Sequence, residues 1–172
     1  MKRFLLAATL LLCIASPAVA ASEKSSEVLW RSWDPGLREA ESTKRPVLVD
    51  VYTDWCGWCK RMDADVYSRP DVREYLSKNF VTIKLNAEST KPATYQGKSH
   101  TGRSLSSGFG VTGYPTTVFL GSDGERLVNV PGYIKGDRFL LLLRYIGEGY
   151  LERGVDFAEF EKSAAPPAKK TP

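Results

Sequence analysis

Residues 49–60 read VDVYTDWCGWCK, and this stretch decides the fold because it joins an apolar segment directly to two cysteines. The apolar segment begins earlier, since RPVLVDVYTD (45–54) is a nearly continuous run of β-branched and apolar residues. A run of this kind predicts a strand that is buried on both faces in the middle of a sheet. We therefore expect a central strand that ends just before Cys56 and Cys59.

The residues after the cysteines alternate between helical and extended patterns. Residues 60–80 carry apolar side chains at helical spacing, and Pro70 marks a break between two helical pieces. Residues 80–88 (FVTIKLNAE) predict a second strand, and residues 104–111 (SLSSGFGV) predict a short helix.

The next segments complete the predicted order of elements. Residues 114–132 predict a hairpin, because Asp123 and Gly124 supply a turn between two extended runs. Residues 135–153 predict an amphipathic helix. The resulting order, β α β α β β α, predicts an α/β fold with a central mixed sheet and helices on both faces.

A polar segment, ESTKPATYQGKSHTGR (88–103), interrupts this pattern and predicts a long surface loop. Its Gly-Lys-Ser tripeptide (97–99) has the form of a phosphate-binding loop. That motif requires a glycine five positions earlier, where Pro92 stands, so nucleotide binding is not expected.

The two ends of the chain differ in composition from the folded region, 28–153. Residues 1–20 combine Lys2 and Arg3, a short apolar stretch and a small-residue ending, which is typical of a cleaved secretory signal. A membrane anchor is the alternative, but the apolar stretch is shorter than the roughly 20 residues that a spanning helix needs. We expect a flexible segment at 21–27, a disordered tail at 154–172, and a soluble protein exported to the periplasm.

Composition limits the possible functions further. The chain of 172 residues is 42% hydrophobic, enough for one domain with a real core. Without Lys2 and Arg3, 22 basic residues face 20 acidic ones, and no basic stripe suggests nucleic-acid binding.

Cys13 should leave with the signal, so the remaining pair, Cys56 and Cys59, needs a local explanation. A structural zinc site needs four ligands, and the chain adds one histidine, His100. Covalent haem needs a histidine after the second cysteine, where Lys60 stands. A static disulfide over so short a loop would stabilise the fold little. A redox-active dithiol at the junction of a strand and a helix is the favoured interpretation.

The spacing suggests separate roles for the two thiols. If a helix begins at about Cys56, its free N–H groups and dipole favour the Cys56 thiolate, which makes Cys56 the predicted nucleophile. Cys59, one turn further, should be more shielded and should resolve the mixed disulfide. Trp55 and Trp58 are either core residues or an apolar collar for protein substrates, and we favour the collar.

At these residues the chain resembles the thioredoxin family. VDVYTDWCGWCK (49–60) is similar to its active-site segment, and GVTGYPTTVFL (110–120) is similar to its strand that opens with a cis-proline. DWCGWCKRMDADVY (54–67) and DVREYLSKNFVTIKLNAE (71–88) have the character of exported thioredoxin-like proteins, including the C-terminal periplasmic domain of the interchange protein DsbD. The resemblance covers residues 45–145 and implies a thioredoxin fold.

The resemblance also implies a function and roles for single residues. Asp50 stands where thioredoxins carry a buried acid that helps to move the proton of the resolving cysteine, and Lys84 matches the lysine that approaches this acid. Pro115 matches the cis-proline, and the backbone of the preceding Tyr114 should pair with the substrate. The expected substrate groove is formed by Trp55, Gly57, Trp58, Tyr114 and Pro115.

The expected activity is thiol-disulfide exchange with protein partners that bear thiols or disulfides, without a metal or organic cofactor. A membrane electron donor is a candidate partner, and we expect a monomer. The sequence departs from thioredoxin in its Gly57-Trp58 dipeptide, its bulky Tyr114 and its longer loop at 88–103. Since strong oxidants carry a histidine between the cysteines, we expect a reductant or an isomerase. Two alternatives remain open: a binding module with a static disulfide, and a metal carrier.

Overall fold

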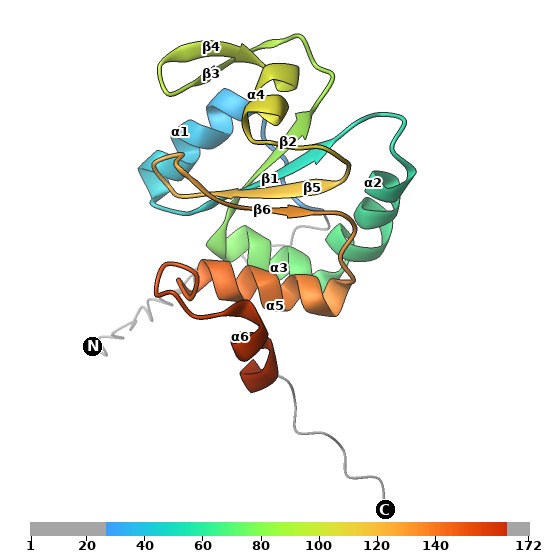
Figure 1. Cartoon of the computed structure of the whole chain (residues 1–172), viewed down its shortest axis with the longest axis vertical. Coiled ribbons are helices and arrows are strands. Elements are labelled where there is room, and N and C mark those ends of the chain that lie inside the picture. The colour runs from blue at the N-terminus through green and yellow to red at the C-terminus, as the bar shows by residue number, and fades with distance from the viewer. Residues whose placement is uncertain (1–26, 165–172) are drawn as a thin grey trace, which may run out of the picture.

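The computed structural model describes residues 27–164, whose centre is a four-stranded sheet in the order β2-β1-β5-β6 (Figure 1). β1 pairs in parallel with β2 and antiparallel with β5, which confirms the predicted mixed sheet. The predicted signal at 1–20, residues 21–26 and residues 165–172 lie outside the described part of the chain. The strands are β1 (Val47–Tyr52), β2 (Val81–Asn86), β5 (Thr116–Leu120) and β6 (Arg126–Pro131).

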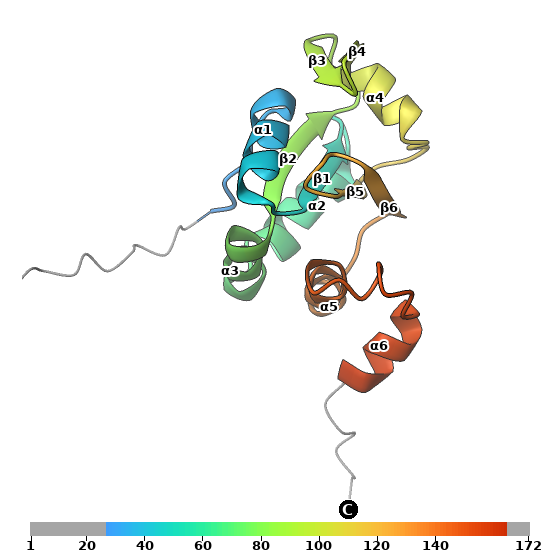
Figure 2. The same ribbon diagram turned by 90° about the vertical axis from the view of Figure 1, so that its left-hand side faces the viewer.

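The central strand β1 contributes side chains to two separate cores, because successive residues of a strand point to opposite faces. Val47, Val49 and Val51 pack with residues of α1 (Trp33–Thr43) and α4 (Gly102–Gly108). Leu48 packs on the other face with residues of α3 (Pro70–Asn79) and α5 (Gly136–Gly147). Figures 1 and 2 show these helices on the two sides of the sheet. The same alternation puts Asp50 on the face of Leu48.

The chain leaves β1 and enters α2 (Gly57–Met62), which continues as one π-helical stretch, η1 (Asp63–Tyr67). α3 then begins at Pro70, and Arg69 before it is extended, as the residue before a proline prefers to be. The predicted break at Pro70 is therefore confirmed. α2 and η1 bring Met62, Val66 and Tyr67 into the core beneath Leu48.

The predicted long loop at 88–103 lies mostly at the surface, but it is not without regular structure. These residues contain a hairpin of β3 (Pro92–Tyr95) and β4 (Lys98–Thr101), whose turn residues Gln96 and Gly97 both have positive φ, as a tight two-residue hairpin requires. Contacts with α1 hold the hairpin: the Trp33 indole N–H donates to the Thr94 carbonyl, and the Thr94 N–H donates to Asp34. Only Ala93 of the two strands is buried, so the hairpin lacks the apolar alternation of an ordinary strand.

The C-terminal region also differs from the prediction. The predicted helix at 135–153 ends at Gly147, and the predicted disorder from residue 154 is wrong for α6 (Phe157–Ala164). Asp156 accepts hydrogen bonds from the N–H groups of Ala158 and Glu159 at the start of α6. Phe160 is buried, and its ring lies 4.6 Å from Tyr150 and 5.5 Å from Tyr145, centroid to centroid. Aromatic burial against α5 thus orders a segment whose composition suggested disorder.

None of the helices formed within residues 27–164 is long and apolar enough to cross a membrane.

Replacing Phe160 with alanine tests whether α6 belongs to the folded domain. Removing a buried aromatic ring leaves a cavity, so we expect the free energy of unfolding to fall by about 3 kcal/mol. Urea unfolding followed by fluorescence measures this change. The exposed neighbour Glu159→Ala is the matched control and should have little effect. Equal stabilities for the two variants would show that α6 does not contribute to the core.

Candidate active site

The two cysteines lie where β1 passes into α2. Cys56 is the N-cap residue of α2, and its N–H donates to the carbonyl of Thr53 over 3.2 Å. The Cys59 N–H donates to the Cys56 sulfur over 3.0 Å. The predicted start of the helix at Cys56 is therefore confirmed. A backbone donor at this sulfur stabilises negative charge on it.

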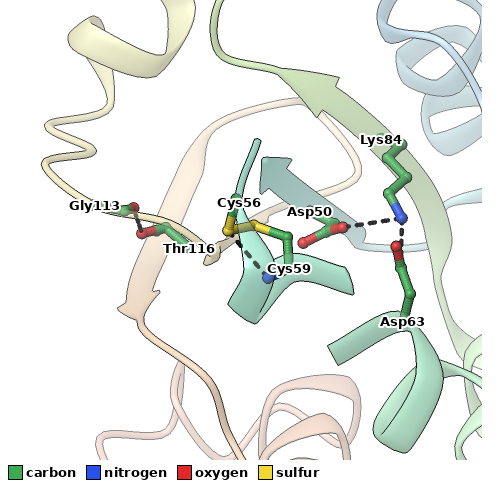
Figure 3. Close-up of a disulfide and its surroundings, with 7 residues drawn as sticks. All are labelled: Asp50, Cys56, Cys59, Asp63, Lys84, Gly113 and Thr116. Carbon is green, nitrogen blue, oxygen red and sulfur yellow. Dashed lines mark hydrogen bonds and ion pairs between the residues drawn. A yellow bond between two sulfur atoms is a disulfide. The ribbon is translucent and has the colours of Figure 1, made fainter. Parts of the chain in front are cut away.

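Cys56 and Cys59 form a disulfide, with their Cα atoms 5.3 Å apart (Figure 3). The predicted difference in shielding is not present in this oxidised form, since 5% of Cys56 and 4% of Cys59 are exposed. Both sulfur atoms are bonded to each other and lie against the protein, so neither residue projects from the surface. The disulfide is therefore accessible only over the residues that flank it.

The flanking tryptophans are the most exposed large apolar residues at this site: 68% of Trp55 and 57% of Trp58 is accessible. The core alternative for them is wrong. Trp55 packs edge-to-face on Tyr114, and its indole N–H donates to Glu88 over 3.0 Å. Trp58 lies 5.5 Å from the ring of Tyr133, between centroids. The sequence did not single out Glu88 or Tyr133, because neither stands near a cysteine in the chain.

The loop before β5 supplies the remaining residues of the expected groove. The Tyr114–Pro115 peptide bond is cis, and Pro115 is buried. The Thr116 hydroxyl donates to the Gly113 carbonyl over 2.8 Å, which closes the turn beside Cys56 in Figure 3. Gly57 is exposed, and an added Cβ there would meet no atom within 4 Å. Trp55 and Tyr114 are in contact, so the segment before Cys56 and the loop before β5 meet at this site, and the substrate groove stays a prediction.

Asp50 lies beneath the disulfide, and only 2% of it is exposed. It stands opposite Lys84 in the pairing of β1 with β2, and the Lys84 ammonium is 3.5 Å from Asp50 Oδ2. Figure 3 shows the Asp50 carboxylate between Cys59 and Lys84. Burial raises the pKa of Asp50 from 3.8 to about 6; the Lys84 charge lowers it, and the nearby carboxylate of Asp63 raises it. This carboxyl can therefore gain or lose a proton near neutral pH.

Asp63 is a member of this group that the sequence analysis missed. Its carboxylate is 2.5 Å from the Lys84 ammonium, closer than that of Asp50. The sequence spacing could have indicated Asp63, because this residue follows Cys59 by four positions and therefore lies on the same helical face. Tyr67 follows by four more, and burial together with the charge of Asp50 raises its pKa well above its usual range.

Comparisons with known proteins agree with this geometry. The sequence profile of the thioredoxin-like domain family matches residues 33–147. The thiol:disulfide interchange protein DsbD of Ralstonia nicotianae is 32% identical over 112 residues, which are 64% of this chain and 17% of that protein. DsbD of Neisseria meningitidis serogroup A is 29% identical over 101 residues, which are 58% of this chain and 15% of that protein. The chain thus spans less than a fifth of these relatives.

Solved structures show the same fold. A thioredoxin-fold protein from Helicobacter pylori superposes with a TM-score of 0.63 at 21% identity, covering 70% of this chain and 80% of that one. A thioredoxin from Thermus thermophilus superposes with a TM-score of 0.56 at 26% identity, covering 72% and 95%.

The profile match covers more than half of the chain, so the chain belongs to the thioredoxin-like domain family. Its fold, its DsbD relatives and its Cys56–Cys59 pair define a thiol-disulfide oxidoreductase.

Replacing Asp50 with asparagine should stabilise the protein at neutral pH. The pKa of Asp50 is higher in the folded state, about 6, than its ordinary value of 3.8. The folded state therefore binds the proton more tightly, and the free energy of unfolding falls as the pH rises between these values, by about 3 kcal/mol. Asparagine cannot ionise, so the free energy of unfolding of the variant should not fall in this way.

The measurement is urea unfolding of the parent and Asp50→Asn at neutral pH and below the ordinary pKa. We expect the variant to be more stable at neutral pH and the difference to shrink in acid. The exposed Asp65→Asn is the matched control. A variant that is no more stable than the parent at neutral pH would contradict the view that burying the ionised Asp50 carboxylate destabilises the folded state.

Proposed function

We propose that this chain is an exported oxidoreductase that exchanges disulfides with protein partners through Cys56 and Cys59. The observation that carries the proposal is the disulfide at the start of α2 with the buried Asp50 carboxyl beneath it. The composition of residues 1–20 supports export. The DsbD relatives support partners that are themselves proteins with thiols or disulfides.

In the proposed reaction the Cys56 thiolate of the reduced protein attacks one sulfur of a partner disulfide. The partner's S–S bond breaks, a mixed disulfide with Cys56 forms, and the other partner sulfur leaves as a thiolate. Cys59 then gives up its proton and attacks the Cys56 sulfur. The second partner thiol is released, the Cys56–Cys59 disulfide forms, and two electrons have passed to the partner.

Asp50 is the proposed acceptor of the Cys59 proton. One of its oxygens, Oδ2, faces Lys84, whereas Oδ1 is buried and has no hydrogen-bond partner among the described residues. A pKa raised to about 6 brings the carboxyl close to neutral pH, where proton exchange with a thiol is efficient. Lys84 limits how far burial can raise this pKa, so that Asp50 is mostly ionised before Cys59 reacts.

Single cysteine variants test the order of attack. Cys56→Ser should lose insulin disulfide reduction entirely, because the attacking thiolate is absent. Cys59→Ser should still attack but should accumulate a mixed disulfide with insulin, visible by non-reducing electrophoresis and removed by dithiothreitol. The double variant is the control for background reduction. Activity retained in Cys56→Ser would refute the mechanism.

We propose further that the protein acts as a reductant or an isomerase. Known pairs of this type range from about −270 mV for thioredoxin to about −120 mV for DsbA. No histidine lies between Cys56 and Cys59 to stabilise the thiolate further, and the Cys56 sulfur accepts a hydrogen bond from the backbone N–H of Cys59. A potential in the lower half of that range is therefore expected.

Equilibration in dithiothreitol and glutathione buffers, followed by tryptophan fluorescence, measures this potential. Trp55 and Trp58 flank the disulfide and should report its reduction. A potential close to that of DsbA would reverse the proposed direction and make the protein an oxidase. A reductant would in turn need a donor of electrons, for which a membrane protein is our candidate.

A further inference from the structure

The segment just before α1, Val28–Arg31, lies along the free edge of β2. Arg31 forms a parallel bridge with Ile83: its N–H donates to the Thr82 carbonyl over 2.9 Å, and its carbonyl accepts from the Lys84 N–H over 3.1 Å. The Thr82 hydroxyl also donates to the Leu29 carbonyl over 2.7 Å. The position of this segment is therefore fixed relative to the backbone of Lys84.

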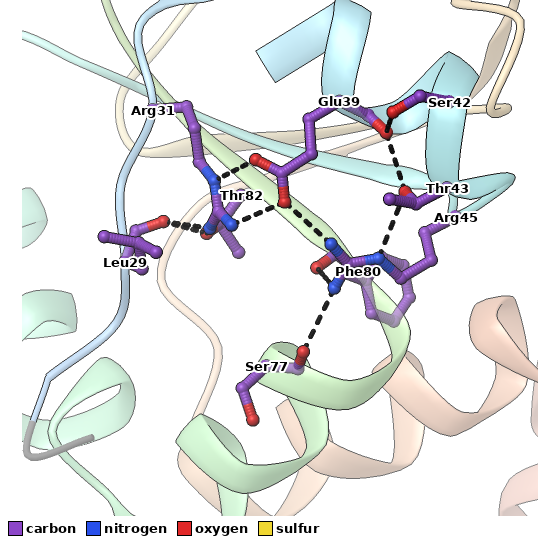
Figure 4. A network of polar contacts seen from close by, with 9 residues as sticks. All are labelled: Leu29, Arg31, Glu39, Ser42, Thr43, Arg45, Ser77, Phe80 and Thr82. Carbon is purple, nitrogen blue, oxygen red and sulfur yellow. Dashed lines mark hydrogen bonds and ion pairs between the residues drawn. The ribbon is translucent and has the colours of Figure 1, made fainter. Parts of the chain in front are cut away.

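Arg31 anchors the segment a second time through its side chain (Figure 4). Its guanidinium donates to both oxygens of Glu39 in α1, over 2.7 and 2.6 Å. Arg45 also donates to Glu39, and Arg45 reaches the carbonyl of Phe80 at the start of β2. Paired donation from a guanidinium to a carboxylate fixes orientation as well as distance. The polar network thus ties Val28–Arg31 to α1 and to the beginning of β2.

This anchoring places the Trp30 ring against Lys84. The Lys84 ammonium is 4.9 Å from the centroid of the Trp30 ring and 5.4 Å from that of Tyr52. Trp30 also packs edge-to-face on the buried Tyr67, with 4.9 Å between the ring centroids. An ammonium at such a distance from an aromatic face is attracted to it, most strongly where water is excluded. The Lys84 side chain is only 22% exposed.

We propose that Trp30 is a positioning residue for proton transfer at the active site: its ring covers Lys84 and holds the ammonium between Asp50 and Asp63. Trp30 does not touch the disulfide in this arrangement, and it acts through Lys84. The inference rests on the proposed role of Asp50 in exchange. It gives the segment before α1 a part in the chemistry, although that segment precedes the region matched by the family profile.

The charges around Lys84 explain why its position matters. Asp63 faces it from η1, and Asp50 and Tyr52 face it from β1. Cys59 of α2 lies beside Asp50 in Figure 3. The neighbouring residue on β5, Thr117, carries no charge. The guanidinium of Arg31 is directed to Glu39, so Lys84 is the cation paired with Asp50 among residues 27–164.

Loss of the Trp30 ring would have two opposing effects on the pKa of Asp50. Water admitted beside Lys84 would relieve the burial of the carboxyl and lower the pKa, whereas movement of the ammonium away from it would raise the pKa. The Trp30 ring lies on the Lys84 ammonium, which is paired with Asp50. The Lys84 charge lowers the pKa of Asp50, so an ammonium that is free to move away should let this pKa rise, and the second effect is the one that the proposal expects.

The test is a carboxyl carbon NMR titration of Asp50 in the oxidised protein. For Trp30→Ala we expect the pKa of Asp50 to rise above its present value of about 6. Trp30→Phe keeps an aromatic face and should stay close to the parent. Trp33→Ala removes a buried tryptophan from the core on the opposite face of the sheet and should lower stability without moving this pKa. If Trp30→Ala does not fold, Trp30→Leu takes its place with the same expected direction.

An unchanged pKa in a folded Trp30→Ala or Trp30→Leu would overturn the proposal and leave Trp30 with a packing role alone. A fall of this pKa in Trp30→Ala would also overturn it, because the ring would then act by excluding water and not by positioning Lys84. An equal rise in Trp33→Ala would overturn it as well, because the effect would then follow from general loss of stability. The titration needs no exchange activity, so its outcome is separate from that of the insulin assay. Where both succeed, the pH profile of insulin reduction should shift to higher pH in Trp30→Ala together with the pKa of Asp50.

Discussion

The burial of the Asp50 carboxylate in the central strand is the constraint on which the site depends. A charge at this position is unfavourable, and the protein offsets the cost in part by placing the Lys84 ammonium on the paired position of the next strand. Neither residue would have this environment without the parallel pairing of β1 with β2. The result is a buried carboxyl beside a disulfide with its pKa raised to about 6, an arrangement that costs stability at neutral pH and that the proposed mechanism uses for proton transfer.

The other residues of the site are arranged around Asp50 and Lys84. α2 and η1 start directly from β1, so one short stretch of chain delivers Cys56, Cys59 and Asp63 to the same side of the sheet. Exposed aromatic side chains from separate elements lie around the disulfide, and the groups that hold or move protons lie below it. In the proposed mechanism, different residues therefore recognise the partner and handle the proton.

The local pattern of the sequence was a good guide wherever the chain is strongly apolar. The continuous run before Cys56 predicted β1, and Pro70 predicted the start of α3. The sequence pattern did not predict the hairpin β3–β4 or α6, because both elements are held by contacts with residues distant in the chain. The hairpin depends on the side chains of Trp33 and Asp34, and α6 depends on the aromatic side chains of α5 and the turns that follow it. Polar composition alone cannot reveal that such partners exist.

The sequence by itself determined the class of fold and the cysteine pair and, through the resemblance to thioredoxins, indicated Asp50, Lys84 and Pro115 as site residues. Each of these features depends on a short segment of the chain, in which residue spacing fixes which side chains share a strand or a helical face. Only the tertiary structure decided that Asp63 competes with Asp50 for the Lys84 ammonium and that Trp30 covers it. Those contacts join residues more than 20 positions apart, and pairing of the segment before α1 with the edge of β2 is what brings Trp30 to Lys84.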